Sequence, residues 1–287
     1  MISGRNKRKS IWKKVLISLF AVVLIFVCLG PILFLVWNAP KSLDEYDKSK
    51  FMPPGDFKNF FSNVKELIDF GLLRWLMNTA IVTVIGIILS LIFSSMAGFA
   101  FSKLRFPGKT PIYWLIIGLL AMPTQVIIIP LFVMFSNLNM INNLFSMALI
   151  YTVFSFAFGT FLMTSFYKGI PDEIMDSARI DGANTFQIFL KIMVPLGKPA
   201  IVTLGVLNFF GFWNELFVSM IFNQNKVSRL VTPGLALLQQ AARAGGSATN
   251  WTLIYTGVLL SIILPFIVYV IFQNRLSSGI TVGAIKG

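Results

Sequence analysis

The sequence predicts an all-α, polytopic membrane protein, and three observations support this fold class. Of the 287 residues, 56% are hydrophobic. Only 12% are charged, whereas a soluble domain carries about 25% charged residues. Long stretches contain no charge, and a helix needs about 20 apolar residues to cross a bilayer core about 30 Å thick. This composition excludes an ordinary soluble enzyme, and the uncharged stretches locate the helices.

The predicted helices follow from these stretches in chain order. Single helices are predicted between Lys14 and Lys41 (26 uncharged residues), Arg74 and Lys103 (28), and Arg243 and Arg275 (31). The stretch between Lys109 and Lys168 holds 58 uncharged residues, and the polar residues 136–143 divide it into two helices. A further apolar segment follows Pro199 and contains one charge, Glu215. The six predicted helices are 15–37, 76–101, 111–135, 144–166, 200–222 and 252–273.

The distribution of cations predicts that both termini are cytoplasmic. In that orientation the cytoplasmic segments carry 15 Lys and Arg and the external segments carry 9, as the positive-inside rule requires. The first apolar run is too long for a signal peptide and is predicted to be a retained anchor. We therefore expect a basic N-terminus at 1–14, a six-helix transmembrane domain at 15–273 with an external loop at 38–74, and a cytoplasmic tail at 274–287.

The residue types present exclude several classes of function. The chain has no histidine, which excludes Ser-His-Asp and Cys-His catalysis and histidine zinc sites. The single cysteine, Cys28, excludes disulfides. The net charge of +13 is explained by topology, so no nucleic acid partner is expected. Gly108-Lys109-Thr110 lacks the earlier glycine of a phosphate-binding loop, because position 103 is Lys. We expect no enzymatic activity, no metal site and no nucleotide site on this chain.

The segment 167–199, between the fourth and fifth helices, is too long for a turn and too apolar for a solvated loop. Acidic residues in its first turn and a stop at Gly182 predict one short helix. Asn184 and Gln187 have the spacing of a capping box and begin a second helix, which we expect Pro195 to end. Several apolar residues need cover: Ile174, Met175, Ala178, Phe186 and Leu190. Two interpretations are about equally favoured by the residues alone. The segment is either a protrusion that fills a groove in a cytoplasmic partner or a hairpin that lies on the lipid headgroups.

The run PDEIMDSARIDGA at 171–183, followed by IMVP at 192–195, resembles the EAA signature of permease subunits of binding-protein-dependent ABC importers. Asp176, Ser177 and Ala178 stand where the family has Glu-Ala-Ala, and Asp176 is one methylene shorter than Glu. The resemblance implies a type I ABC importer permease fold in which 167–199 is the cytoplasmic coupling loop. The implied ATPase-coupling residues are Glu173, Asp176, Ser177, Ala178, Asp181, Gly182, Ala183, Phe186, Ile192 and Pro195.

Trp213-Asn214-Glu215 and the C-terminal residues 279–287 further resemble the carbohydrate-uptake branch, in particular the second permease of maltose-type systems. This resemblance implies a prokaryotic inner-membrane location and the following partners: a second homologous permease, two ATPase subunits, an extracellular solute-binding protein, a sugar and membrane lipid. ATP and Mg are expected on the partner ATPase, with no cofactor on this chain. The external segments 38–74 and 223–251 would meet the binding protein.

Glu215 is the only ionisable residue within a predicted span, where an isolated charge costs about 3 kcal/mol. Small and polar residues share its helical face: Gly205, Asn208, Gly211, Glu215 and Ser219. Lining of a solute pathway and hydrogen bonding between helices or subunits both remain open, as does a position of Glu215 near the outer interface. The pathway candidates are Asn208, Gly211, Asn214 and Glu215.

The function expected from these features is a permease subunit that forms half of the transmembrane pathway for a sugar or oligosaccharide. A separate ATPase, docked on the coupling loop, would drive alternating access. Two alternatives remain: an ABC importer permease for a non-sugar solute, and a self-sufficient channel or secondary transporter.

Overall fold

The structure, a computed structural model, describes residues 3–244 and 250–284, with side chains placed at 13–240 and 250–273. The described residues form helices joined by turns, without a strand, so the all-α prediction is confirmed. The chain divides into two compact units, each of which is described separately below. The first comprises the chain up to Gly71 together with Leu237–Ile262, and the second comprises Leu72–Ala236 together with the chain from Ile263 onward.

The first unit contains three helices of its own: α1 (Ser3–Asn38), α2 (Leu43–Lys48) and α3 (Lys58–Phe70). The turn after α1 is its centre, because Ala39 and Lys41 are fully buried. Asn63 of α3 donates to the carbonyls of Ala39 (2.9 Å) and Lys41 (3.2 Å). The predicted external loop 38–74 is therefore largely a folded, hydrogen-bonded element.

Lys41 is an unusual residue in this unit, since lysine is almost never fully buried unless it is paired. Its ammonium group donates to Asn38 Oδ1 at 2.9 Å and to the Ser49 carbonyl at 2.7 Å. Loss of hydration on burial lowers the pKa of Lys41, and the nearby charge of Glu45 partly opposes this effect. Lys41 thus holds the loop after α2 against the end of α1.

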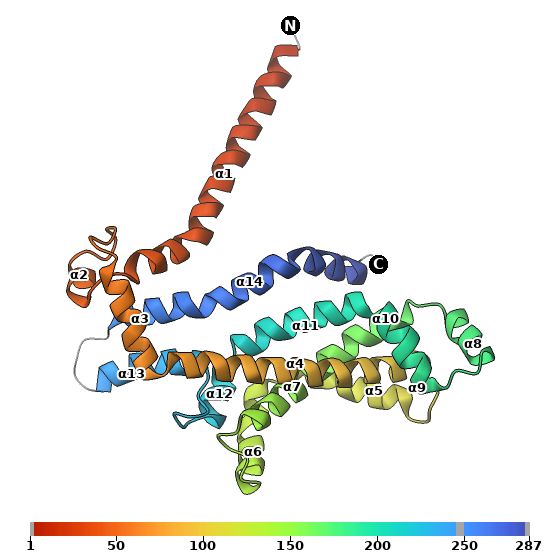
Figure 1. Cartoon of the computed structure of the whole chain (residues 1–287). Helices are drawn as coiled ribbons and strands as arrows, with labels where there is room; N and C mark the ends of the chain where they lie inside the picture. Colours follow the sequence, from red (N-terminus) through yellow and green to blue (C-terminus); the bar gives the residue numbers. More distant parts are fainter. Residues whose placement is uncertain (1–2, 245–249, 285–287) are drawn as a thin grey trace. The chain divides into compact units, whose positions relative to one another are not determined.

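The second unit is built on two long helices, α4 and α7, which pack along each other together with α11 (Figure 1). Its elements are α4 (Leu72–Lys103), α5 (Lys109–Gly118), η1 (Leu119–Ala121), α6 (Thr124–Asn137), α7 (Leu144–Lys168), α8 (Asp172–Ile180), α9 (Thr185–Ile188), η2 (Phe189–Met193), α10 (Val194–Leu196), α11 (Lys198–Trp213) and α12 (Phe217–Phe222). Two further helices, α13 (Val231–Ala244) and α14 (Trp251–Ala284), contribute residues to both units.

Small residues allow α4 and α7 to approach closely, as is common between membrane helices. A Cβ on Gly98 of α4 would lie 2.9 Å from the carbonyl carbon of Met163, and a Cβ on Gly159 of α7 would lie 2.8 Å from Ser94 Cβ. Side chains larger than hydrogen therefore do not fit at these two positions without a shift of a helix.

Among the described residues, four helices are long and apolar enough to cross a membrane, and two bent helix pairs raise this number to six if each pair is one span. The four are Lys13–Asn38, Leu72–Lys103, Leu144–Lys168 and Trp251–Gln273. The bent pairs are Lys109–Ala121 with Thr124–Asn137, and Thr185–Leu196 with Lys198–Trp213. The prediction of a polytopic membrane protein is therefore confirmed.

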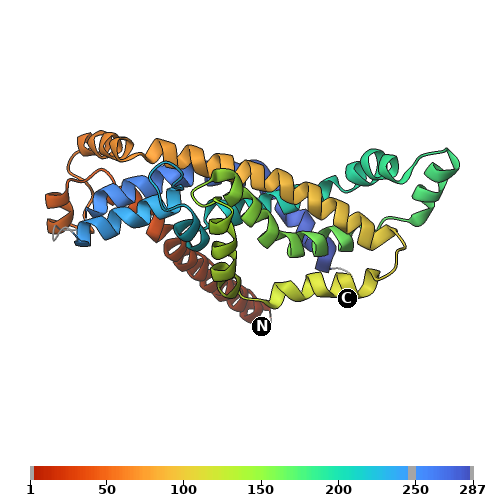
Figure 2. The same cartoon turned by 90° about the horizontal axis from the view of Figure 1, so that it is seen from below.

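The predicted continuous helix 111–135 is wrong, because the chain bends by 103° between η1 and α6 (Figure 2). Met122 is extended (φ −84°, ψ 123°) and precedes Pro123, which precedes α6. A residue before proline is sterically driven out of the helical region, so the helix stops there. Pro130 and Pro265, in contrast, lie inside α6 and α14.

The ends of the chain fall largely outside the described side chains. The predicted N-terminal segment 1–14 is helical from Ser3, but side chains are described only from Lys13 onward. The predicted tail 274–287 is a continuation of α14 as far as Ala284, and its side chains lie outside the described residues.

Candidate functional site

The first predicted helix of segment 167–199 is α8, whose ends are set by local sequence. Pro171 precedes it in an extended conformation, and Asp172 and Glu173 occupy its first turn, where the helix dipole favours negative charge. Ser177 donates to the Glu173 carbonyl at 2.9 Å, and Arg179 pairs with Asp176 at 2.8 Å. Because Arg179 and Asp176 are both well exposed, this ion pair contributes little to stability.

The turn after α8 depends on Gly182, which has φ +81°. That left-handed conformation is strained for residues with a Cβ, and it lets the chain reverse directly after Asp181. The amide of Gly182 donates to the Arg179 carbonyl, and the amide of Ala183 donates to the Ala178 carbonyl, both at 3.0 Å. A Cβ on Gly182 would meet no atom within 4 Å, so its backbone angle, rather than crowding within the chain, requires glycine.

The second predicted helix begins with the capping box that the sequence predicts. The amide of Gln187 donates to Asn184 Oδ1, and the amide of Asn184 donates to Gln187 Oε1, both at 2.9 Å. The prediction that Pro195 ends this helix is wrong. A π-helical turn, η2, follows α9, and Pro195 lies inside α10. Proline supplies no N–H, and a wider turn before it accommodates the missing bond.

The two short helices have a covered side and an exposed side. The covered side packs in one hydrophobic cluster of the second unit, whose buried members include Phe99, Met163, Tyr167, Met175, Ala178, Ile188, Phe189 and Met193. The exposed side carries Ile174 (39% exposed), Ile180 (86%), Phe186 (62%) and Leu190 (47%). Of the apolar residues predicted to need cover, Met175 and Ala178 therefore receive it from this chain, whereas Ile174, Phe186 and Leu190 do not.

The ten coupling candidates divide along the same two sides. Ala178 is buried and Ala183 and Ile192 are half-buried against the cluster. The other seven are exposed: Glu173, Asp176, Ser177, Asp181, Gly182, Phe186 and Pro195. Six of the seven lie at the turn between α8 and α9 or on these two helices, and Pro195 lies further along the chain in α10. This surface combines acidic, small and apolar residues.

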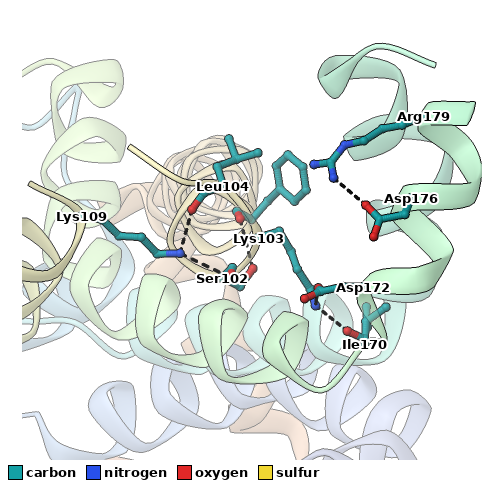
Figure 3. Close-up of polar contacts among 9 residues, drawn as sticks. Ser102, Lys103, Leu104, Lys109, Ile170, Asp172, Asp176 and Arg179 are labelled. Carbon is teal, nitrogen blue, oxygen red and sulfur yellow. Dashed lines mark hydrogen bonds and ion pairs between the residues drawn. The ribbon is translucent and has the colours of Figure 1, made fainter. Parts of the chain in front are cut away.

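Lys103 attaches this region to a membrane helix, and sequence reasoning missed it. Its ammonium group lies 2.5 Å from Asp172 Oδ1 and also donates to the Ile170 carbonyl (Figure 3). The Lys103 side chain is only 5% exposed, whereas that of Asp172 is 75% exposed. The hydrogen bond and the positive charge of Lys103 lower the pKa of the Asp172 carboxyl group. The only sequence signal was a lysine at the end of an apolar run, which predicts a membrane boundary equally well.

Glu215 lies in a break between α11 and α12, so the predicted continuous helix 200–222 is wrong. Its carboxylate accepts from the amides of Val218 (2.7 Å) and Ser219 (2.9 Å), which are free donors in the first turn of α12. The hydroxyl of Tyr151 on α7 donates to the same carboxylate at 3.0 Å. The Glu215 carbonyl accepts from the Thr232 hydroxyl at 2.6 Å. Glu215 therefore joins α7, α12 and α13, and the charge is compensated by three donors.

The other pathway candidates occupy different environments. Asn208 is buried and donates to Ser90 of α4 at 2.8 Å, and Ser155 of α7 donates to the same hydroxyl at 2.8 Å. Gly211 and Asn214 are exposed. The Asn214 side chain donates to the Phe210 carbonyl at 2.9 Å. Asn208 is therefore bonded between helices, whereas Gly211 and Asn214 are exposed on this chain.

A cavity of about 300 Å³ lies in the second unit between α4, α11 and α14. Its lining is apolar and includes Leu91, Gly205 and Phe272. A hydroxylated solute needs polar groups that fix its orientation, and this cavity offers almost none. Within the described residues, no group of three or more His, Cys, Asp or Glu is placed to hold a metal ion.

The sequence profile of the family described as "Binding-protein-dependent transport system inner membrane component" matches residues 86–282. The chain is 25% identical to the diacetylchitobiose uptake system permease protein NgcG of Streptomyces coelicolor, over 99% of this chain and 91% of that protein. It is 32% identical to the sulfoquinovosyl glycerol transport system permease protein SmoH of Agrobacterium fabrum, over 74% of this chain and 73% of that protein.

Among solved structures, the fold resembles a chain of a bacterial ABC transporter involved in the import of the acidic polysaccharide alginate. The TM-score is 0.76 at 26% identity, and the alignment covers 94% of this chain and 96% of the other.

Proposed function

This chain belongs to the family of inner-membrane components of binding-protein-dependent transport systems, and we propose that it supplies half of the membrane pathway of an ATP-driven importer for a sugar or oligosaccharide. The observation that carries the proposal is the two-sided region formed by α8 and α9. Its inner side is buried in this chain, and its outer side exposes apolar and acidic residues at one end of the second unit. A hairpin built only to lie on lipid would not need the acidic residues on that surface.

The exposed side of α8 and α9 is the proposed contact for a separate ATPase. Phe186 and Ile180 would fill a groove in that protein, and Asp176 and Glu173 would meet its cations. Gly182 forms the tip of the contact, where a larger side chain would stand between the two proteins. Ala178, Ala183 and Ile192 hold the contact surface on the membrane helices from within. ATP and Mg belong to the partner, and this chain binds neither.

The proposed motion is transmitted through rigid contacts. When the ATPases close, they move α8 and α9, and Lys103 carries the movement to α4 through its bonds to Asp172 and Ile170. Because α4 packs closely on α7 at Gly98 and Gly159, these two helices move together. Helix α11 follows α10 after a 74° bend and provides a second route. Alternating access then results from rocking of this half against a second, homologous permease.

The proposed topology places both termini and the α8–α9 region in the cytoplasm of a prokaryotic cell. The folded elements within 38–74 and the segment 223–251 would then face outward and receive the solute-binding protein.

The sugar substrate is supported by the names of the relatives, which transport diacetylchitobiose and sulfoquinovosyl glycerol, and by the alginate importer. Gly211 and Asn214, both exposed, are the proposed solute contacts; Asn208 and Glu215 are proposed to shape the pathway from behind.

Reconstitution tests the proposal directly. Proteoliposomes that contain this chain, its companion permease and the ATPase should accumulate sugar only with ATP inside and binding protein outside. This chain alone should move none. Sugar movement by the chain alone, without ATP, would instead support a self-sufficient channel or secondary transporter.

Site-directed crosslinking tests the docking surface separately. In a Cys28→Ser background, Phe186→Cys should form a crosslink to the ATPase. Leu138→Cys has a similar exposed fraction (60% against 62%) but lies at the end of α6, and should form none. Labelling of both cysteines from the same side of the membrane would contradict the topology.

A further inference from the structure

At the end of the second unit that carries α8, three cations form no ion pair with the described side chains. Arg105 lies in the turn between α4 and α5, Lys109 is the first residue of α5, and Lys168 is the last residue of α7. Ion pairs in the described part of the chain are Lys58–Asp56, Lys103–Asp172 and Arg179–Asp176. Arg105, Lys109 and Lys168, which we call the basic cluster, are therefore not neutralised by ion pairing with any side chain that the structure describes.

The three members are held close together by short-range contacts. Lys109 donates to the Leu104 carbonyl at 2.8 Å, next to Arg105 (Figure 3). The Lys168 ammonium group lies 5.5 Å from the ring centre of Tyr113, which is one helical turn after Lys109. Both contacts orient an ammonium group without cancelling its charge, because a carbonyl and an aromatic ring are neutral acceptors.

Electrostatic interactions within the cluster are mainly repulsive. Arg105 and Lys168 both act on Lys109, and the one opposing charge is Asp172. Asp172 is already paired with Lys103 at 2.5 Å. Lys191 and Lys198 are further exposed cations of the same loop region. The cluster is therefore a local excess of positive charge.

Aromatic residues adjoin the cluster. Tyr113 contacts Phe101 (ring centres 5.5 Å apart) and Trp114 (5.7 Å), and Phe101 also contacts Phe106 at 5.8 Å. Trp114 is 64% exposed. Tyrosine and tryptophan are enriched where membrane proteins meet the headgroup region, and α4, α5 and α7 all begin or end here. The cluster therefore has the residue types expected at the depth of the lipid phosphates.

We propose that Arg105, Lys109 and Lys168 bind the phosphate group of an anionic phospholipid in the cytoplasmic leaflet, with its glycerol and upper acyl chain against Trp114. The proposal rests on the proposed function only for the choice of leaflet. Three unpaired cations are complementary to one phosphate, which offers several strong acceptor oxygens. A basic residue near an anionic membrane surface is worth about a fivefold change in affinity. The bound lipid would fix the turn between α4 and α5 next to Lys103.

Quenching of Trp114 fluorescence by brominated lipid tests this proposal in the purified permease–ATPase complex in nanodiscs. The fluorescence of Trp114 is obtained by subtracting the fluorescence of the Trp114→Phe complex from that of the unmodified complex. Brominated phosphatidylglycerol should quench this signal at a lower lipid fraction than brominated phosphatidylcholine. The double variant Arg105→Gln/Lys168→Gln should raise the half-quenching fraction of phosphatidylglycerol by roughly 25-fold. Lys109 is kept, because it bonds the end of α4.

Two matched variants separate a specific site from diffuse charge and from misfolding. Lys191→Gln/Lys198→Gln removes the same number of charges and should keep the preference for phosphatidylglycerol. Arg105→Lys/Lys168→Arg conserves charge and should also keep it. Equal quenching by the two lipids in the unmodified complex would overturn the proposal, as would loss of the preference in either matched variant.

A final arm distinguishes a lipid from free phosphate. Sodium phosphate and sodium chloride at equal ionic strength should weaken the preference equally. If sodium phosphate abolishes the preference for phosphatidylglycerol and sodium chloride does not, the site binds soluble phosphate and the lipid assignment is overturned. Because the measurement needs neither ATP nor sugar, a negative result leaves ATP-dependent uptake, and hence the proposed function, unaffected.

Discussion

The ammonium group of Lys103 lies 2.5 Å from the carboxylate of Asp172, and this contact joins the end of a membrane-spanning helix to the first turn of α8. The same ammonium group donates to the Ile170 carbonyl (Figure 3). The Lys103 side chain is 5% exposed, so the ammonium group is shielded from water, whereas the Asp172 side chain is 75% exposed. The contact is therefore a mechanical connection between the proposed ATPase contact and α4.

Replacement of Lys103 by methionine should uncouple ATP hydrolysis from transport. The variant keeps a side chain of similar length but loses both bonds, so we expect several-fold less sugar to be moved per ATP hydrolysed. Asp172→Asn should have a smaller effect, because the bond to Ile170 remains and the asparagine oxygen still accepts from Lys103. The measurement is the ratio of sugar uptake to phosphate release in proteoliposomes.

The charge-conserving variant Lys103→Arg serves as the control and should retain most of the coupling. An equal fall of uptake and hydrolysis in Lys103→Met would point to poor assembly with the ATPase. If both uptake and hydrolysis stay at the level of the unmodified protein, Lys103 is not part of the proposed route.

The lowered pKa of Asp172 predicts where pH affects the contact. A carboxyl group whose pKa is lower in the folded protein stabilises the fold above its unfolded pKa of about 3.9. That contribution is lost as the pH falls through the folded pKa, which lies below this value. The difference in melting temperature between the unmodified protein and Asp172→Asn should therefore be constant from about pH 5 to pH 8 and decrease below about pH 4. A difference that changes near neutral pH would contradict this assignment.

Gly182 allows two effects of a substitution to be separated. With φ +81° and open space around its Cβ, Gly182→Asn should fold at a cost of about 1 kcal/mol or less, because asparagine tolerates this conformation. Gly182→Trp adds bulk at the tip of the proposed ATPase contact and should abolish ATP-coupled uptake while membrane insertion persists. Copurification of the ATPase, measured for both variants, reports docking. Normal uptake by Gly182→Trp would count against docking at this turn.

The parts of the site that could be predicted from sequence are those set by neighbouring residues. The stop at Gly182 and the capping box of Asn184 and Gln187 depend on backbone groups within three or four positions. The capping geometry therefore follows from their spacing alone. The long apolar helices were predictable for a similar reason, since membrane thickness sets their length.

Contacts between distant residues could not be predicted in this way. Lys103 and Asp172 are 69 positions apart, and Tyr151 and Glu215 are 64 apart. In both cases one partner has a residue type that is already expected at its position, a lysine at a membrane boundary or a tyrosine in a core. The neighbouring sequence therefore does not indicate that this residue also bonds to a distant carboxylate. The break at Glu215 was missed because the hydropathy on both sides is equally high, and the carboxylate that caps α12 was interpreted only as a charge within a span.

Glu215→Ala should impair transport without releasing the ATPase. The substitution leaves the amides of Val218 and Ser219 and the hydroxyl of Tyr151 without their acceptor. Loss of a helix cap costs about 0.5–2 kcal/mol. The substitution therefore destabilises the junction of α7, α12 and α13. The α8–α9 region packs in a separate hydrophobic cluster. We therefore expect reduced sugar uptake with normal copurification of the ATPase.

Glu215→Gln separates the cap from the charge, because its amide oxygen can accept from one of the two α12 amides and from Tyr151. If the cap is what matters, Glu215→Gln should recover most of the uptake and Tyr151→Phe should lose little. If the negative charge itself acts on the solute, Glu215→Gln should be as impaired as Glu215→Ala. Unchanged uptake in Glu215→Ala would remove this residue from the pathway, because the three bonds to its carboxylate would then be unnecessary for transport.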